Sequence, residues 1–232
     1  MNIIIDKRMR MQEKQYLKKF GELIELPPQN SVYGEISGHP DIFFTKINDE
    51  IFKAKNVLLN HKEIMTLKEG EEEVGYEYPE DVKYNICQIG NNIIHDFKYT
   101  DKRILKYITN QKNLKQIPVH QGYSKCNIVA TSEKSCITSD EGIYNFIKLY
   151  QLDVLLLKDE NIHLLDRNGN ISNMNGFIGG ASAIIYDKFI LFGDSNKLKN
   201  LDLLLEHLNK YNLNLIDFKG LDIIDYGGII TF

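Results

Sequence analysis

The sequence predicts one α/β domain over residues 1–232, a five-bladed α/β propeller of ββαβ units. Three observations lead to this fold class. Two short β-rich runs joined by a tight turn are followed by a helical run and a further apolar run, and this order recurs about every 40 residues. With 232 residues, 43% of them hydrophobic, the chain can bury a full core. The apolar runs at the two ends, 2–6 and 227–232, complement each other, so their pairing would close the ring.

The first unit is split between the two ends of the chain. We expect strands 2–6 and 22–26 to flank helix 11–20 and the C-terminal strand 227–232 to complete the hairpin. The second unit has strands 41–48 and 50–56, and its short helix leads into an acidic loop, 69–81. This second copy is the most degenerate.

The third, fourth and fifth units are clearer. Gly90-Asn91 is a favoured hairpin turn in the third, and Asp101, Asp140 and Asp194 stand where helix N-caps are expected. In the fifth, four leucines share one helix face, which would cover a sheet: Leu201, Leu204, Leu205 and Leu208. The predicted elements are strands 84–90, 91–97 and 114–120 with helix 100–111, strands 126–131, 136–140 and 153–159 with helix 141–151, and strands 182–187, 188–194 and 213–218 with helix 196–211.

An open, doubly wound α/β sheet is the competing architecture. Such sheets alternate single strands with helices, whereas hairpins precede the helices here. The propeller is therefore the favoured interpretation.

Composition excludes several classes of function. The net charge is −4 and only four of the 28 basic residues are arginine, which argues against nucleic acid as a partner. Three cysteines, an odd number, favour a reducing compartment, and we expect a cytoplasmic protein. No apolar stretch is long enough to span a membrane or form a signal-peptide core. No dinucleotide, phosphate-loop or CxxC motif occurs, so we expect no cofactor and no metal.

In a ring, the segments that connect consecutive units converge on the axis, and function is expected there. Each of these segments contains glycine, which permits close backbone approach, although the same residues would serve in ordinary turns. They are 37–41, 120–126, 176–182 and 225–228.

Cys126 is the candidate nucleophile. It is the only cysteine in a predicted axial segment, and a nearby base or cation such as His120 or Lys125 lowers the pKa of a thiol. The alternative is a small apolar residue at the start of a strand. Cys87 and Cys136 lie inside predicted strands and have packing roles in this interpretation.

His39 and Asp41 form a second candidate pair. In an extended chain, residues two apart point to the same face, so the carboxylate could orient the imidazole, or both could bind a cationic substrate. Alternatively, Asp41 bonds only to the local backbone at a turn. These two readings stay open.

The five units, the segment Gly38-His39-Pro40-Asp41 and the segment Asp225-Tyr226-Gly227-Gly228 together resemble the pentein superfamily of guanidino-group-modifying enzymes. The strings at 120–126 and 176–182 look like a clostridial-type branch of that superfamily. The resemblance is architectural and covers the whole chain.

The resemblance implies a hydrolase or amidinotransferase that acts on an arginine-like small molecule. A thiolate would attack the guanidinium carbon, a histidine would move protons and carboxylates would hold the cation. In the superfamily the cysteine follows a glycine pair near the C-terminus, but here Gly227-Gly228 is followed by Ile229. We therefore expect a relocated nucleophile, with Cys126 and His120 catalytic.

The resemblance also supplies the expected binding residues and a rival function. The candidates for binding a small cationic substrate are His39, Asp41, Lys125 and Asp225. A non-catalytic member that binds a small ligand or a macromolecule is the alternative. Docking of a basic partner on the acidic loop 69–81 is a third hypothesis.

Overall fold

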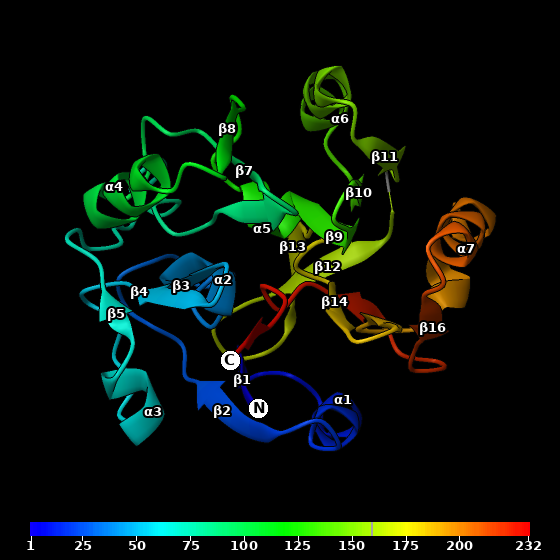
Figure 1. The fold of residues 1–232 in the computed structure, drawn as a ribbon. Coiled ribbons are helices and arrows are strands. Elements are labelled where there is room, and N and C mark those ends of the chain that lie inside the picture. Colours follow the sequence, from blue (N-terminus) through cyan, green and yellow to red (C-terminus); the bar gives the residue numbers. More distant parts are fainter. Residues whose placement is uncertain (159) are drawn as a thin grey trace.

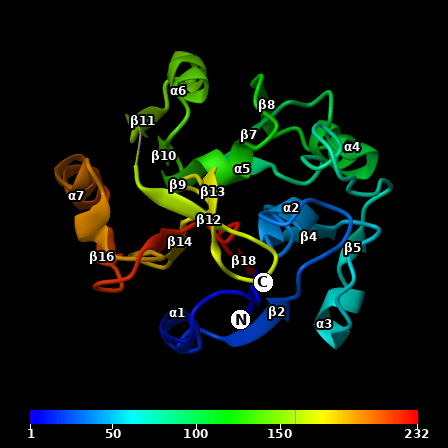
Figure 2. The same cartoon turned by 180° about the vertical axis from the view of Figure 1, so that it is seen from behind.

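The strands form small sheets, each of three strands. A computed structural model of the chain describes residues 1–158 and 160–232, and the strands in those ranges belong to six sheets. Asp159, at the end of the predicted strand 153–159, lies outside the described residues. The chain is a mixed α/β protein in which most helices lie at the periphery and the first strands of most sheets lie nearer the middle (Figures 1 and 2).

Five of the sheets share one pairing pattern. A central strand pairs antiparallel with its hairpin neighbour and parallel with the strand that follows the helix. This confirms the strand pairing of the predicted units. In order of first, central and last strand, they are β3 (Phe44–Ile47), β4 (Glu50–Lys53), β5 (Lys68–Glu69); β6 (Cys87–Ile89), β7 (Asn92–His95), β8 (Lys115–Pro118); β9 (Ile128–Ser132), β10 (Ser135–Thr138), β11 (Asp153–Leu156); β14 (Ser182–Ile185), β15 (Lys188–Leu191), β16 (Asn214–Ile216); and β18 (Ile230–Thr231), β1 (Asn2–Asp6), β2 (Glu22–Leu26).

The two ends of the chain pair with each other, as predicted. β18 runs antiparallel to β1, with Ile4 opposite Ile230. The amide of Asn2 donates to the carbonyl of Phe232 at 2.6 Å, and the amide of Phe232 donates back at 3.0 Å. Both ends lie side by side in the two ribbon views (Figures 1 and 2).

A sixth sheet was not predicted. It consists of β12 (Ile162–Leu165), β13 (Ile171–Asn175) and β17 (Ile223–Ile224). β12 pairs antiparallel with β13 and parallel with β17. The strands are short, and four of the five residues of β13 are exposed, Ile171 and Met174 among them, so the sequence carries no clear alternation of buried apolar and exposed polar residues there.

Each of the five shared-pattern sheets has a helix between its central and last strands. Asp101 caps α4 through the amides of Arg103 and Ile104, and Asp140 caps α6 through Ile143, as predicted. Asp194 caps a short 3-10 helix, Ser195–Lys197, so the predicted helix 196–211 is broken in two. The five helices are α1 (Met11–Leu17), α3 (Lys62–Met65), α4 (Lys102–Asn110), α6 (Glu141–Ile147), which continues as a 3-10 turn at Lys148–Tyr150, and α7 (Leu201–Lys210).

In two of the predicted strands, a helical turn takes the place of the first residues. A helical turn, α2 (Pro40–Phe43), precedes β3, and another, α5 (Ser124–Asn127), precedes β9. Asp41 therefore lies in a helical turn and not in a strand, whereas His39, the residue before the turn, has extended backbone. Pro40 occupies the first helical position, where its fixed φ favours a turn of helix.

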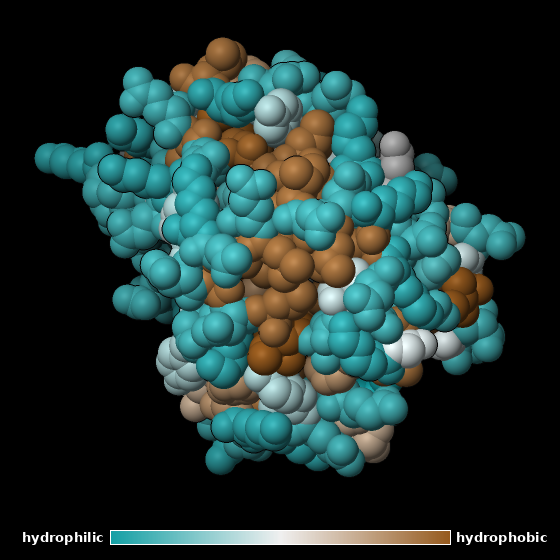
Figure 3. All heavy atoms as spheres, turned by 90° about the vertical axis from the view of Figure 1, so that its right-hand side faces the viewer, coloured by the Kyte–Doolittle hydropathy of each residue, from teal (hydrophilic) through white to brown (hydrophobic). Residues whose placement is uncertain are grey.

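The core consists of apolar clusters around the sheets. In α7, Leu204 and Leu208 are fully covered, whereas Leu205 is 38% exposed, so the predicted leucine stripe is narrower than expected. On the side that carries α6 and α7, apolar surface runs between hydrophilic borders (Figure 3). In the described part of the chain, no helix is both long and apolar enough to cross a bilayer.

Candidate functional site

The segments that precede the first strands contact one another. Asn85 Nδ2 donates to the carbonyl of Asp41 at 3.2 Å. Asn85 Oδ1 in turn accepts from the amides of Lys125 at 2.7 Å and Cys126 at 3.1 Å. One asparagine side chain thus joins the segments before β3, β6 and β9.

The remaining two sheets join through backbone contacts. The amide of Gly180 donates to the carbonyl of Cys126 at 2.9 Å, and the amide of Gly228 donates to the carbonyl of Gly180 at 2.8 Å. Gly227, with φ +70°, lies so close to His39 that a Cβ would sit 2.4 Å from the His39 Cβ. Consecutive contacts therefore pass through all five sheets and return to the segment before β3.

The Cys126 thiol lies inside this ring of contacts. Its Sγ donates to Asp41 Oδ2 at 3.1 Å and accepts from Asn85 Nδ2 at 3.0 Å. The residue is 2% exposed. Burial, and then the charges of Asp41 and Asp225, raise the pKa of the thiol well above its ordinary value, so the neutral thiol is favoured when no cation is bound.

Two buried carboxyl groups flank the thiol. Burial raises the pKa of Asp41 to about 6, against the opposing charge of Lys125. Burial and then the charge of Asp41 raise the pKa of Asp225 to about 7. Asp225 accepts from the amides of Phe177 at 2.9 Å and Gly227 at 2.8 Å, which hold it in place.

His39 is a buried, neutral imidazole. It is 1% exposed, and its Nδ1 lies 3.7 Å from Asp225 Oδ1. Burial, and then the charge of Arg8, lower its pKa well below the ordinary value. Among residues 1–158 and 160–232, neither ring nitrogen has a hydrogen-bond partner.

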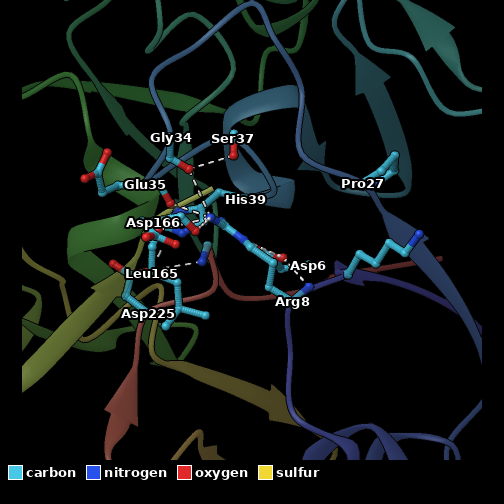
Figure 4. Close-up of polar contacts among 12 residues, drawn as sticks. Asp6, Arg8, Pro27, Gly34, Glu35, Ser37, His39, Leu165, Asp166 and Asp225 are labelled. Carbon is cyan, nitrogen blue, oxygen red and sulfur yellow. Dashed lines mark hydrogen bonds and ion pairs between the residues drawn. The ribbon is translucent and has the colours of Figure 1, made fainter. Parts of the chain in front are cut away.

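Arg8 holds together the two segments that cover the site. Its guanidinium binds both oxygens of Asp6 and donates to the carbonyls of Gly34 and Glu35, each at 3.0 Å. It also donates to Leu165 and Asp166, at the end of β12, at 3.0 Å each. Figure 4 shows Arg8 surrounded by these groups, with His39 and Asp225 nearby.

A cavity of about 160 Å³ opens beside the thiol. This volume is below the roughly 300–1,000 Å³ of sites for drug-sized ligands, so it suits a small group. The Tyr33 and Tyr123 hydroxyls are 3.3 Å apart, and that of Tyr123 also donates to Asp81. The lining residues are Tyr33, Ile36, His39, Tyr123, Cys126, Leu164, Met174, Asn175, Phe177 and Asp225.

The structure brings together Cys126, His39, Asp41 and Asp225 but not His120. His120 is exposed and lines a different cavity, beside Gln121 and Asp140. The two cavities share no lining residue. The expectation that His120 exchanges protons with Cys126 is corrected accordingly: the turn at Gln121-Gly122 separates it from α5, and His39 is the imidazole beside the thiol.

Lys125 lies on the other side of the ring. It lines a second cavity of about 420 Å³ together with Lys46, Cys87 and Thr231. Its positive charge partly opposes the rise that burial causes in the pKa values of Asp41 and Asp225. No carboxylate in the described residues forms an ion pair with its ammonium group.

Sequence reasoning missed Asn85 and Arg8. Asn85 stands two residues before β6, and Cys126, Gly180 and Gly228 stand two residues before β9, β14 and β18. Comparison of the units at that position would have found Asn85. The partners of Arg8 are mostly backbone carbonyls, which leave no sequence pattern.

Comparisons with known proteins identify a family and a fold. A protein-family model, described as a family of unknown function (DUF6873), matches residues 4–230. A search of curated proteins gives no match.

Several solved structures are similar over nearly the whole chain. A cysteine-to-serine variant of DDAH from Pseudomonas aeruginosa, complexed with citrulline, has 10% identity and a TM-score of 0.52, with 93% of this chain and 91% of that chain covered. Agmatine deiminase of C. jejuni has 13% identity and a TM-score of 0.53, with 93% and 86% covered. SxtG, an amidinotransferase from Microseira wollei in the saxitoxin biosynthetic pathway, has 9% identity and a TM-score of 0.54, with 96% and 88% covered. These are proteins of the pentein superfamily, and the chain has their fold.

Proposed function

The chain belongs to DUF6873, a family of unknown function, and from that premise we propose that it acts on a small molecule with a guanidino or amidino group. The reaction is cysteine-dependent hydrolysis or amidino transfer, with Cys126 as the nucleophile. The observation that carries the proposal is that the Cys126 thiol, an imidazole and two carboxyl groups meet beside one small cavity.

The charges of the site favour a cationic ligand. Asp41 and Asp225 are fully buried, and burial raises both pKa values. A guanidinium group in the cavity would supply the missing positive charge, because an opposite charge nearby favours ionised carboxyl groups. Planar guanidinium also matches carboxylate oxygens in its hydrogen-bond geometry. The ligand and the two carboxylates would stabilise each other.

The chemistry follows from the neighbours of the thiol. The Cys126 proton passes to the neutral His39 imidazole, and the sulfur forms a bond to the guanidinium carbon. As the C–N bond breaks, the imidazolium returns the proton to the leaving nitrogen, which departs as an amine or ammonia. Water then adds to the carbon with His39 as base, and the C–S bond breaks to regenerate the thiol. In transfer, an amine replaces water.

The names of the similar structures support this class of substrate. They include a DDAH complexed with citrulline, an agmatine deiminase and an amidinotransferase.

We also propose that the five shared-pattern sheets form a closed, five-bladed propeller in one domain. The ring of contacts from Asp41 to Gly228 and the pairing of β1 with β18 support that arrangement. The unpaired thiols support a cytoplasmic location.

Ligand binding without turnover is the second candidate function. It is favoured by the raised pKa of Cys126 and by its burial, since thiolates and not thiols are nucleophiles. In this case the cavity and its carboxyl groups would bind the same cation, and Cys126 would only pack against it.

The test combines binding with turnover. Guanidino and amidino compounds are screened by thermal shift in the presence of a chelator, and each one that stabilises the protein is tested for release of ammonia or amine. We expect Cys126→Ala to abolish turnover and Cys136→Ala, a buried thiol in β10 outside the site, to retain it. If a compound binds and no turnover is detected, the result supports the second candidate function, ligand binding without catalysis. If no cationic compound stabilises the wild-type protein, both fail.

A further inference from the structure

The ring of contacts also places three different kinds of metal ligand together. An imidazole nitrogen of His39, a carboxylate oxygen of Asp41 and the sulfur of Cys126 all lie within 4.8 Å of one another. All three residues are buried. They come from two segments, 39–41 and 126, so no local spacing in the sequence indicates a metal site.

Three polar atoms of this cluster lack hydrogen-bond partners in the described residues. In the described chain, His39 Nδ1, His39 Nε2 and Asp41 Oδ1 are buried and make no hydrogen bond. A buried polar group without a partner destabilises the folded state, and such groups are rare enough in proteins to call for an explanation by a water molecule or an ion. One ring nitrogen of His39 and one oxygen of Asp41 are therefore free to coordinate a shared ion, while the other ring nitrogen faces Asp225.

We propose that His39, Asp41 and Cys126 bind a divalent transition-metal ion of the Zn²⁺ class. Sulfur, imidazole nitrogen and carboxylate oxygen are the ligands that Zn²⁺ takes in proteins. Calcium and magnesium prefer oxygen ligands alone and larger coordination numbers, so the thiol and the imidazole select against them. This inference goes beyond the proposed function, because it assigns a second ligand to the site.

The geometry fits after a small adjustment. Ligands about 2.0–2.3 Å from one tetrahedral ion lie roughly 3.3–3.8 Å from each other. Cys126 Sγ and Asp41 Oδ2 are 3.1 Å apart, and the widest separation in the cluster is at most 4.8 Å. Rotation of the His39 ring or of the Asp41 carboxylate would bring the ligand atoms from at most 4.8 Å apart to the spacing of a tetrahedral ion.

The surroundings supply the outer contacts of a metal centre. Asp225 Oδ1 lies 3.7 Å from His39 Nδ1 and would orient the imidazole. Asn85 Nδ2 donates to the sulfur at 3.0 Å and would stabilise the thiolate. His39 and Cys126 both line the 160 Å³ cavity, so a fourth coordination position faces open space, as in catalytic zinc sites.

Metal binding and cysteine chemistry exclude each other at this site. A thiolate that coordinates a metal is not available to attack carbon, so the metal-loaded protein should not turn over a guanidino substrate. The two ligands therefore compete, and a chelator separates the two activities experimentally.

The experiment is a titration of the chelator-treated 232-residue protein with Co²⁺, which reports a bound thiolate through an intense sulfur-to-metal absorption band. We expect one equivalent of Co²⁺ to develop the band and Zn²⁺ to displace it. Cys126→Ala should remove the band, and His39→Gln and Asp41→Asn should weaken binding by more than about tenfold. Cys136→Ala and His120→Ala are the matched controls and should bind like the wild type.

Two outcomes would overturn the proposal: no sulfur-to-metal band in the wild type, or a band that survives in Cys126→Ala. Because ligand loss can also unfold a protein, circular dichroism of each metal-free variant is compared with the wild type. If a variant does not fold, X-ray absorption spectroscopy of the zinc-loaded wild-type protein tests the proposal instead. A zinc coordination shell without sulfur would contradict the assignment of Cys126 as a ligand. Turnover measured in chelator is independent, so metal binding and the proposed function fail separately.

Discussion

The Cys126 thiol donates a hydrogen bond of 3.1 Å to Asp41, a residue 85 positions earlier in the chain. The two side chains come from equivalent helical turns, α5 and α2, each directly before the first strand of a sheet. The bond places a carboxyl group and a thiol side by side in a buried site, where burial raises the pKa of both. A positively charged ligand beside them would favour the ionised form of each group.

Asp41→Asn should make the protein more stable at high pH. The folded-state pKa of Asp41, about 6, is above its ordinary value of 3.8, so its contribution to stability is complete below pH 3.8 and is lost as the pH rises through 6. The shift corresponds to at most about 3 kcal/mol. The amide oxygen of asparagine still accepts the thiol proton. We expect a higher free energy of unfolding in urea for the variant at pH 8, and about half of that difference at pH 5, because the loss runs from pH 3.8 to pH 6.

Asp187→Asn is the control for that prediction. Asp187 is exposed, and hydrogen bonds from Lys188 and Asn214 lower its pKa. Its ionised form therefore stabilises the folded state, so Asp187→Asn should lower the free energy of unfolding at high pH and not raise it. Equal pH profiles for wild type and Asp41→Asn would show that Asp41 is not a destabilising buried charge.

Substitution of His39 and substitution of His120 should have different effects on kcat. His39 lines the cavity with Cys126, whereas His120 lines another one. We expect His39→Ala to lower kcat for the guanidino substrate by about 10²-fold or more, as for loss of a general acid–base, and His120→Ala to change it less than twofold. A loss of similar size in His120→Ala would return the catalytic role to that residue.

Arg8→Lys should loosen the cover of the cavity. The guanidinium side chain is 7% exposed and contacts four carbonyl groups and Asp6, and an ammonium group cannot reproduce that fork. Because buried acceptors lose their donors, we expect a loss of roughly 2–5 kcal/mol in unfolding free energy. Hydrogen exchange should accelerate first at 34–37 and 162–175. Arg103→Lys, at an exposed ion pair with Glu71, should be neutral.

Gly180→Ala should disturb the site directly. A Cβ at Gly180 would lie 1.9 Å from Asp225 Oδ1, so the carboxylate must move. We expect thermal stability to fall and stabilisation by guanidino ligands to disappear. The comparison is Gly142→Ala in α6, where the added Cβ meets only Asp140 Oδ1, at 3.1 Å, and where alanine favours helix by up to about 1 kcal/mol. Unchanged ligand stabilisation in Gly180→Ala would contradict the placement of Asp225.

Local patterns in the sequence predicted the repeated part of the fold. Hairpins such as β6–β7, with Gly90 at its turn, and caps such as Asp101 depend on neighbouring residues, and the structure has them. The helical turns α2 and α5 contain only four residues each, too few for a periodic pattern. The sixth sheet depends on β17, a two-residue strand placed by distant contacts.

The site was predictable to the extent that it depends on position within a unit. Cys126, His39, Asp41 and Asp225 all lie in segments that the sequence places near an axis, and the structure brings them together; their roles stay predictions. His120 lies close to Cys126 in the sequence, and this closeness alone predicts a catalytic role for it. A single turn between the two residues places their side chains at different cavities. Asn85 and Arg8 act through backbone groups of other segments, and such contacts exist only in the folded chain.

The pairing of β1 with β18 has a consequence for the order of folding during synthesis. The sheets β3–β5, β6–β8 and β9–β11 consist of strands that follow one another along the chain, and each can form as soon as its own segment has left the ribosome. β1 and β2 can pair with each other early, but their sheet is complete only when translation has reached residues 230 and 231 of β18. Until then, one edge of β1 is unpaired, and an unpaired strand edge can pair with another chain.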